Sequence, residues 1–182
     1  MAKIVEEGGC VIGGCCGTTP KHISEMKKVC EHKKIKVPEK KNDTIVSSYG
    51  KAVVFGEKPI IIGERINPTG KSKMKQALKE NHLDYLLKEA ITQQEKGADI
   101  LDVNVGLPDI NEPEMMKKVI PEIQSVTNLP LQIDTVNVTA LESAMRLYNG
   151  KPMVNSVTGK QESMDKVFPL IQKYGGVVVG LT

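Results

Sequence analysis

The sequence contains no tryptophan, and aromatic residues make up only 3% of its 182 residues. Its apolar runs are short, and none approaches the roughly 20 residues that a membrane-spanning helix needs. The first residues, "MAKIVEEGG", are charged and lack the apolar segment of a signal peptide. All 4 cysteines lie within the first 30 residues. These absences predict a reduced, cytoplasmic protein with no membrane partner and no disulfide framework.

Charge is unevenly placed along the chain. The net charge is +3, and residues 1–58 hold 11 Lys and Arg against 7 Asp and Glu, whereas residues 59–182 hold 14 against 15. The excess comes mainly from "HKKIKVPEKK", which no aromatic stacking residues accompany. We therefore interpret residues 35–57 as a basic, solvated linker, and we expect no nucleic-acid partner.

Beyond this linker, apolar runs alternate with helical patterns. The runs "KPIIIGERIN", "ADILDVNVG", "LPLQIDT", "KPMVNSVTG" and "VVVGLT" predict strands, and the stretch "SKMKQALKENHLDYLLKEAITQQEKG" predicts one helix. Apolar strands that alternate with helices are typical of a parallel α/β sheet. A doubly wound sheet would carry a GxGxxG loop, which is absent. We predict a TIM barrel of the (β/α)8 type, incomplete because such barrels need about 250 residues.

The front section has a different pattern. Its sequence "GGCVIGGCCGTTPKHISEMKKVCEH" predicts one strand, a turn, and a helix that begins near Pro20. One strand and one helix cannot bury a core alone. Cys15 and Cys16 would form a strained disulfide with each other, whereas zinc accepts thiolates as ligands. The residues alone leave two interpretations open, a pair of zinc ligands or a pair of buried structural thiols.

Polar side chains end the predicted strands. They are Glu64, Asp102, Asn104, Asp134 and Asn155. In a barrel the carboxyl ends of the strands meet at one mouth, which holds the active site. Carboxylates and amides there suit a heterocycle such as a pterin, with Asp134 as a two-point acceptor and Asn155 on a neighbouring edge. Structural alternatives are a Glu64–Arg65 ion pair and the bracing of strand ends by Asp102 and Asn104.

Two groups of motifs resemble one enzyme family, the cobalamin-dependent methionine synthases. "GGCCGTTPKHI" is similar to the end of their homocysteine-binding barrel, and "IIIGERINPTGK", "ADILDVNVG", "LQIDT" and "MVNSVTG" resemble the start of their pterin-binding barrel. The resemblance implies three parts: residues 1–34 as the last strand and helix of the zinc barrel, residues 35–57 as the linker, and residues 58–182 as the N-terminal part of the pterin barrel. We therefore expect a fragment of such an enzyme, with partial sites that are inactive in isolation.

The activity that this resemblance implies is methyl transfer from 5-methyltetrahydrofolate through cobalamin to homocysteine, which gives methionine. Cys15 and Cys16 fall on two zinc ligands, and the third lies on an earlier strand of the family's barrel. No catalytic residue is assigned. Methylcobalamin is expected on another module of the same parent protein, because no DxHxxG signature occurs here. The positions implied for pterin binding are Glu64, Asp134 and Asn155, together with Asp102 and Asn104 from a neighbouring strand end.

Two alternatives stay open. A methyltetrahydrofolate:corrinoid protein methyltransferase uses the pterin barrel alone, although it has no use for "GGCCGT". A non-catalytic folate-binding remnant would keep the pterin site without its catalytic partners. Dihydropteroate synthase shares the pterin barrel, but "GERINPTGK" is not its opening motif.

Overall fold

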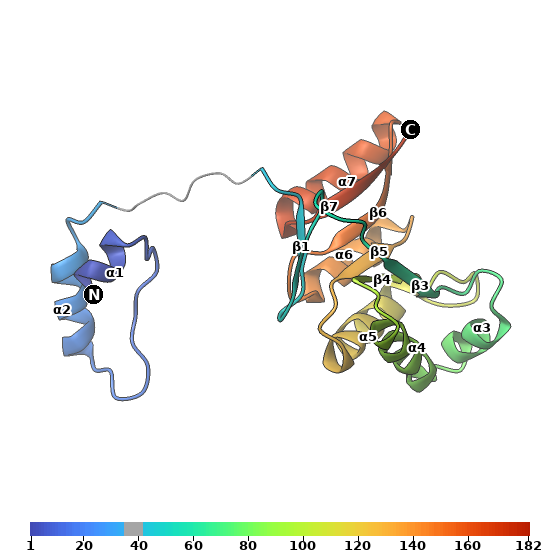
Figure 1. Cartoon of the computed structure of the whole chain (residues 1–182), viewed down its shortest axis with the longest axis horizontal. Helices are drawn as coiled ribbons and strands as arrows, with labels where there is room; N and C mark the ends of the chain where they lie inside the picture. Colours follow the sequence, from blue (N-terminus) through green and yellow to red (C-terminus); the bar gives the residue numbers. More distant parts are fainter. Residues whose placement is uncertain (35–41) are drawn as a thin grey trace. The chain divides into compact units, whose positions relative to one another are not determined.

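The computed structural model describes residues 1–34 and 42–182, which fall into two compact units, Met1–Asn42 and Asp43–Thr182 (Figure 1). The central part of the expected linker, residues 35–41, lies outside the described residues. In the described part of the chain, no helix is both long enough and apolar enough to cross a membrane. The sheet and its helices belong to the second unit, and the cysteines belong to the first.

A parallel sheet of five strands forms the centre of the second unit, in the order β3-β4-β5-β6-β7. Each strand lies beside the one that precedes it in the chain, and no reversal of strand order occurs. This order is the one that a (β/α) barrel builds, and it differs from the order of a doubly wound sheet. The predicted barrel-type α/β fold is confirmed. The strands are β3 (Ile62–Ile66), β4 (Ile100–Val103), β5 (Leu131–Asp134), β6 (Met153–Thr158) and β7 (Val177–Leu181).

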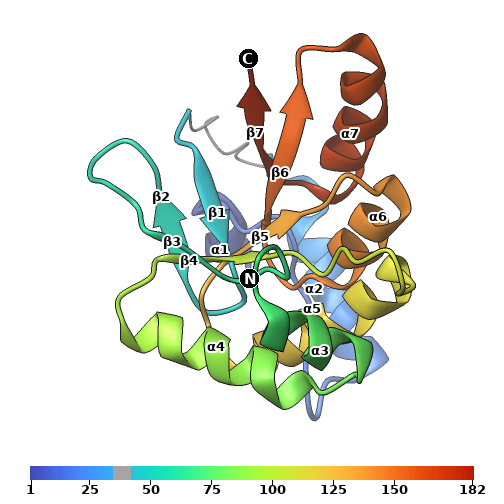
Figure 2. The ribbon, with the colours of Figure 1, turned by 90° about the vertical axis from the view of Figure 1, so that its right-hand side faces the viewer.

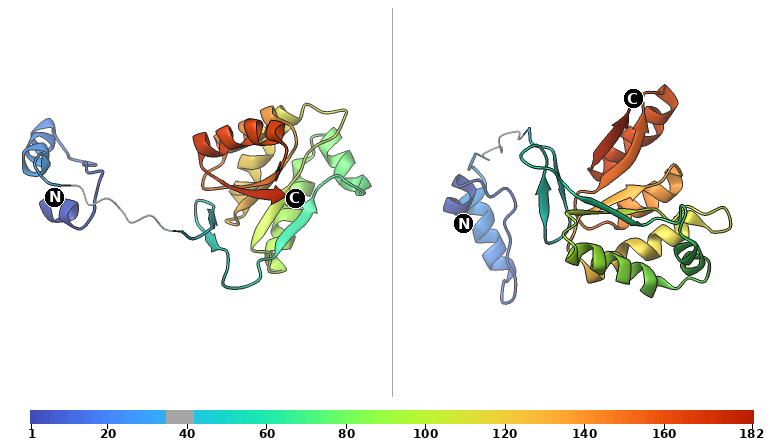
Figure 3. Two further views of the ribbon diagram at one scale, coloured as in Figure 1. Left: turned by 90° about the horizontal axis from the view of Figure 1, so that it is seen from above. Right: turned by 45° about the vertical axis from the view of Figure 1, so that its right-hand side comes forward.

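Helices connect the strands and lie along the outer face of the sheet (Figure 3). They are α3 (Ser72–Lys79), α4 (Leu83–Glu95), α5 (Glu112–Val126), α6 (Val138–Leu147) and α7 (Gln161–Tyr174). The single helix predicted before β4 is in fact two, because Asn81 adopts a left-handed φ of 56° that breaks the helical path. Asn137 caps α6 by accepting hydrogen bonds from the N–H groups of Thr139 and Ala140.

The core lies mainly between the sheet and these helices. Strand residues such as Leu101 and Ile133 are fully buried there, and they pack against helix residues such as Leu86 and Met116. Successive strand residues point to opposite faces. The strand residues that alternate with them, such as Ile100 and Asp102 on β4 and Gln132 and Asp134 on β5, therefore face the inner side of the curved sheet.

A small antiparallel hairpin covers the amino end of that inner side. It consists of β1 (Ile45–Ser47) and β2 (Ala52–Val54). Val46 and Val53 are buried against Ile100 and Met153, which forms an apolar floor (Figure 2 shows the hairpin beside the sheet). The prediction of a solvated linker over residues 35–57 is therefore wrong for residues 45–54. In "TIVSSYGKAVVF" two short apolar runs flank the turn residues Ser48 to Lys51, which suits a hairpin that packs on a sheet.

The first unit contains α1 (Ala2–Glu6) and α2 (Pro20–Cys30). The helix begins at Pro20, as predicted, and the N–H of Thr19 donates to Nδ1 of His22 at 3.1 Å. The strand predicted ahead of this helix is not formed within residues 1–34. A lone strand has no backbone partner in so small a unit, and the glycines of this stretch weaken it further.

Candidate functional site

The polar residues predicted at the strand ends lie on the inner side of the sheet, above the apolar floor. Asp102 follows Ile100 by two residues and therefore shares its face. The register then pairs Asp102 with Gln132 on β5, and Asp134 with Asn155 on β6. An apolar layer at the amino end of the sheet is thus followed by a polar layer at its carboxyl end.

Hydrogen bonds join these side chains across strands. Nδ2 of Asn104 donates to Oδ2 of Asp134 at 2.9 Å, and Oδ1 of Asn104 accepts from the N–H of Gly106 at 2.8 Å. The amide of Gln132 donates to a carboxylate oxygen of Asp102. The structure therefore brings Asp102, Asn104 and Asp134 into one cluster.

Asp102 is the most deeply buried charged group of this cluster, with 2% of its surface exposed. The pKa of its carboxyl is raised from 3.8 to about 6, mainly by burial and to a smaller extent by the nearby carboxylates of Asp134 and Glu64. Hydrogen bonds from the amides of Gln132 and Asn155 act in the opposite direction. The four predicted residues Asp102, Asn104, Asp134 and Asn155 thus share one electrostatic environment.

Glu64 lies at the edge of the cluster and is mostly exposed. The ammonium of Lys71 donates to the backbone oxygen of Glu64 at 2.9 Å and lies 4.0 Å from its carboxylate. Arg65 turns away and lies 3.7 Å from the carboxylate of Glu89. The Glu64–Arg65 ion pair considered as a structural alternative is therefore not formed.

The cysteines form no comparable cluster. Cys15 and Cys16 are exposed free thiols, which excludes the interpretation as buried structural thiols. Within residues 1–34 and 42–182, no group of three or more His, Cys, Asp or Glu side chains is arranged to hold a metal ion. A catalytic zinc needs three protein ligands. The described residues therefore offer two thiols but not a complete zinc site.

Gln132 is a member of the cluster that the sequence analysis missed. It ranks among the buried polar residues, with 7% exposed. The clue was its position two residues before Asp134, which places both side chains on the same face of β5. It was missed because Leu131 and Ile133 flank it directly in "LPLQIDT", so that the segment reads as an apolar strand.

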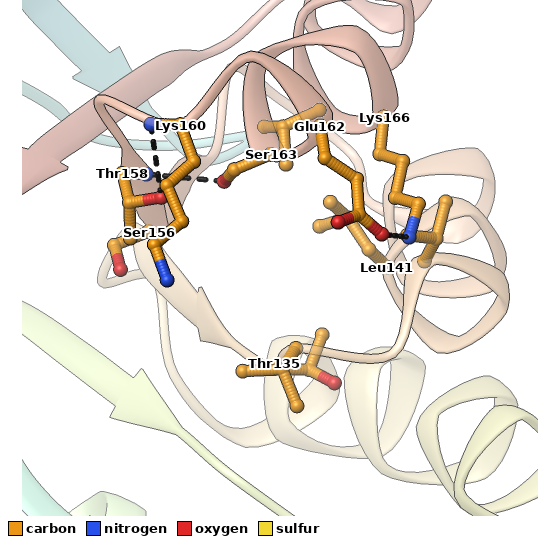
Figure 4. Close-up of a pocket in the computed structure, with 11 residues that line it drawn as sticks. Thr135, Leu141, Ser156, Thr158, Lys160, Glu162, Ser163 and Lys166 are labelled. Carbon is orange, nitrogen blue, oxygen red and sulfur yellow. Dashed lines mark hydrogen bonds and ion pairs between the residues drawn. The ribbon is translucent and has the colours of Figure 1, made fainter.

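A cavity of about 240 Å³ lies beside this cluster, between the carboxyl ends of β5 and β6 and the first turns of α6 and α7 (Figure 4). Thr135 and Ser156, the residues after Asp134 and Asn155, line it. In Figure 4 the side chain of Lys160 runs past Thr158 and Ser156, whereas the ammonium of Lys166 donates to the carboxylate of Glu162 at 2.6 Å.

A parallel sheet built in barrel order, with carboxylates and amides at its carboxyl edge, defines a barrel-type unit of the kind in which enzymes place their active sites at that edge. Residues 63–181 match the family described as pterin binding enzyme, and the chain belongs to this family. Residues 1–30 match a second family, described as homocysteine S-methyltransferase.

Curated relatives extend the similarity over both units. The chain is 30% identical over 191 residues to a methionine synthase of Mycobacterium leprae, and the match covers 98% of this chain and 16% of that protein. It is also 30% identical over 188 residues to a methionine synthase of Mycobacterium tuberculosis, with the same coverage. The resemblance to methionine synthases is thereby confirmed, and this chain spans about a sixth of their length.

Solved structures support the fold. A dihydropteroate synthase of Xanthomonas albilineans with 4-aminobenzoic acid has a TM-score of 0.50 at 22% identity, covering 69% of this chain and 47% of that one. A dihydropteroate synthase of Thermus thermophilus has a TM-score of 0.50 at 20% identity, covering 75% and 47%. At this level of identity the likeness concerns the architecture alone.

Proposed function

We propose that the polar cluster binds the pterin ring of 5-methyltetrahydrofolate, and that the chain serves methyl transfer from this folate through cobalamin to homocysteine. The observation that carries the proposal is the in-register pair of Asp134 and Asn155 at the ends of β5 and β6. The amide of Asn104 donates to Asp134, and Asp102 lies beside the pair. The match to pterin binding enzymes over residues 63–181 supports it.

The chemistry of the pterin edge fits this arrangement. A pterin presents an amino group beside a ring N–H, and an ionised carboxylate accepts from both at once. Asp134 is half-buried and is held by the amide of Asn104, so its carboxylate has a fixed orientation. Asn155 offers both a donor and an acceptor for a neighbouring edge, and Glu64 stands at the rim with Lys71 beside it.

The residues of this chain would also assist the departure of the methyl group. N5 of the folate is a poor leaving group unless a proton reaches it, and polar groups around the ring hold that proton. Cobalamin, when bound, supplies the nucleophile that accepts the methyl group, and we assign none of its binding residues to this chain.

The homocysteine part of the proposal concerns the first unit. We propose Cys15 and Cys16 as two zinc ligands, with the third supplied from outside the described residues. The match of residues 1–30 to homocysteine S-methyltransferases supports this, and it favours a methionine synthase over a corrinoid protein methyltransferase that uses the pterin barrel alone. Because two thiols do not complete a zinc site, we derive no reaction step from the metal.

The decisive experiment is titration calorimetry of the full chain with 5-methyltetrahydrofolate. Asp134→Asn keeps the shape of the side chain but removes its charge and one acceptor, so we expect affinity to fall about 10- to 100-fold. Asp84→Asn, on the exposed start of α4, is the matched control and should bind as the wild type does. Equal affinity of Asp134→Asn and wild type, or no binding by the wild type, would refute the pterin site.

A further inference from the structure

Gln132 lies on the inner face of the sheet between a polar and an apolar neighbour. On β4 its in-register neighbour is Asp102, and on β6 it is Met153, which belongs to the apolar floor with Ile100 and Val46. Gln132 therefore lies where the floor meets the polar cluster. A buried amide at such a boundary is costly unless its hydrogen bonds are made.

The amide of Gln132 makes its hydrogen bond to the carboxylate of Asp102, which is itself almost fully buried. Two like charges face this carboxylate, Glu64 from β3 and Asp134 from β5. These two charges raise the pKa of Asp102, whereas hydrogen bonds from two uncharged amides, Gln132 on β5 and Asn155 on β6, lower it. The amide of Gln132 has the larger effect of the two.

We propose that Gln132 is a positioning residue of the site: it fixes the carboxylate of Asp102 and keeps it ionised, as an acceptor for the ligand. The role of Asp102 toward a folate rests on the function proposed above, whereas the effect of Gln132 on Asp102 does not. Without this donor, the buried carboxylate of Asp102 would face the carboxylates of Asp134 and Glu64 with only the amide of Asn155 to offset them. The protonated form of Asp102 would then be favoured, and its pKa would rise. A protonated Asp102 accepts less well from the N–H groups of a pterin.

The test is a carboxyl carbon NMR titration of the full chain, with the Asp102 signal assigned by its loss in Asp102→Asn. Gln132→Met keeps the length of the side chain and removes the donor. We expect the midpoint of Asp102 to rise from about 6 by about one pH unit, since a hydrogen bond to a charged group is worth at least that much.

The matched control is Gln124→Met on α5. Gln124 is as buried as Gln132, with 8% exposed, and its amide donates to the backbone oxygen of Asn149 at 3.0 Å, not to the cluster. This variant loses that bond and the one that Gln124 accepts from the N–H of Asn149 at 2.9 Å, and its Asp102 midpoint should stay at the wild-type value. Binding of 5-methyltetrahydrofolate gives a second measurement: Gln132→Met should bind about three-fold more weakly at pH 6.5 and nearly as well as wild type at pH 8.5.

An unchanged Asp102 midpoint in folded Gln132→Met overturns the proposal, whether or not folate binds. If Gln132→Met does not fold, Gln132→Asn replaces it, because the shorter side chain withdraws the amide while the site stays polar, and the same upward shift is expected. Failure of the wild type to bind folate at any pH would instead refute the proposed function, and the titration would still decide the role of Gln132.

Discussion

Replacing Asp102 by asparagine should change the pH dependence of stability in a defined direction. The pKa of this carboxyl is about 6 in the folded chain against an ordinary value of 3.8. The folded state therefore binds the proton more tightly than the unfolded state does. The stabilisation that comes from this proton is complete below pH 3.8 and is lost as the pH rises through about 6. Asp102→Asn carries no such proton and should not show this loss.

The size of the effect follows from the two pKa values. A difference of about two units corresponds to about 3 kcal/mol over the full titration, because each unit is worth about 1.4 kcal/mol. Between pH 4.5 and 7.5 the wild type should lose about 2 kcal/mol of unfolding free energy relative to Asp102→Asn. The difference between the two chains therefore reports on Asp102 together with its electrostatic interactions with Asp134 and Glu64.

The assay is urea denaturation of both chains at pH 4.5, 6.0 and 7.5, followed by circular dichroism because the chain has no tryptophan. We expect the free-energy difference between variant and wild type to move in favour of the variant as the pH rises. A difference that stays constant with pH, or that moves toward the wild type, would show that Asp102 is not a buried carboxyl with a raised pKa.

Three further predictions concern stability. Tyr148→Phe should cost about 1 to 2 kcal/mol in urea denaturation, because the hydroxyl donates to the oxygen of Ser47 and accepts from the buried N–H of Leu131. Gly150→Ala should destabilise more than an Ala substitution at an exposed loop glycine, since φ is 139° and a Cβ would stand 2.2 Å from the oxygen of Ser47; equal effects would contradict this. Asn137→Ala should cost about 1 kcal/mol through the lost cap of α6, and Asn137→Ser should restore most of it.

The pattern of the strands could be predicted because it is local. The five apolar runs form the five strands, and their polar ends converge as the barrel order requires. Asp102, Asn104, Asp134 and Asn155 were found in this way, since the end of a parallel strand defines the edge of the sheet on which a side chain lies. Their partners across strands depend on register, which the sequence does not show.

Features that depend on distant contacts were missed for a physical reason. The hairpin at residues 45–54 is stable because Val46 and Val53 fill the floor beside Ile100 and Met153, and none of these residues is adjacent in sequence. In the same way, the hydrogen bond of Gln132 to Asp102 depends on the pairing of β4 and β5, which the sequence does not show. The strand near Cys15 is the opposite case: its local pattern predicted a strand, but residues 1–34 contain no partner strand for it, and it does not form.

The environment of Asp102 supports the binding role proposed for it above. Buried carboxylates that serve structure are paired with a cation, because an unpaired buried charge costs free energy. Around Asp102 the charged groups that raise its pKa are both carboxylates, and the groups that offset them are neutral amides. The fold therefore carries a buried acceptor whose negative surroundings favour a ligand rich in N–H donors. A pterin edge has that character, and the free energy that this carboxylate costs the empty fold would be recovered when the edge is bound.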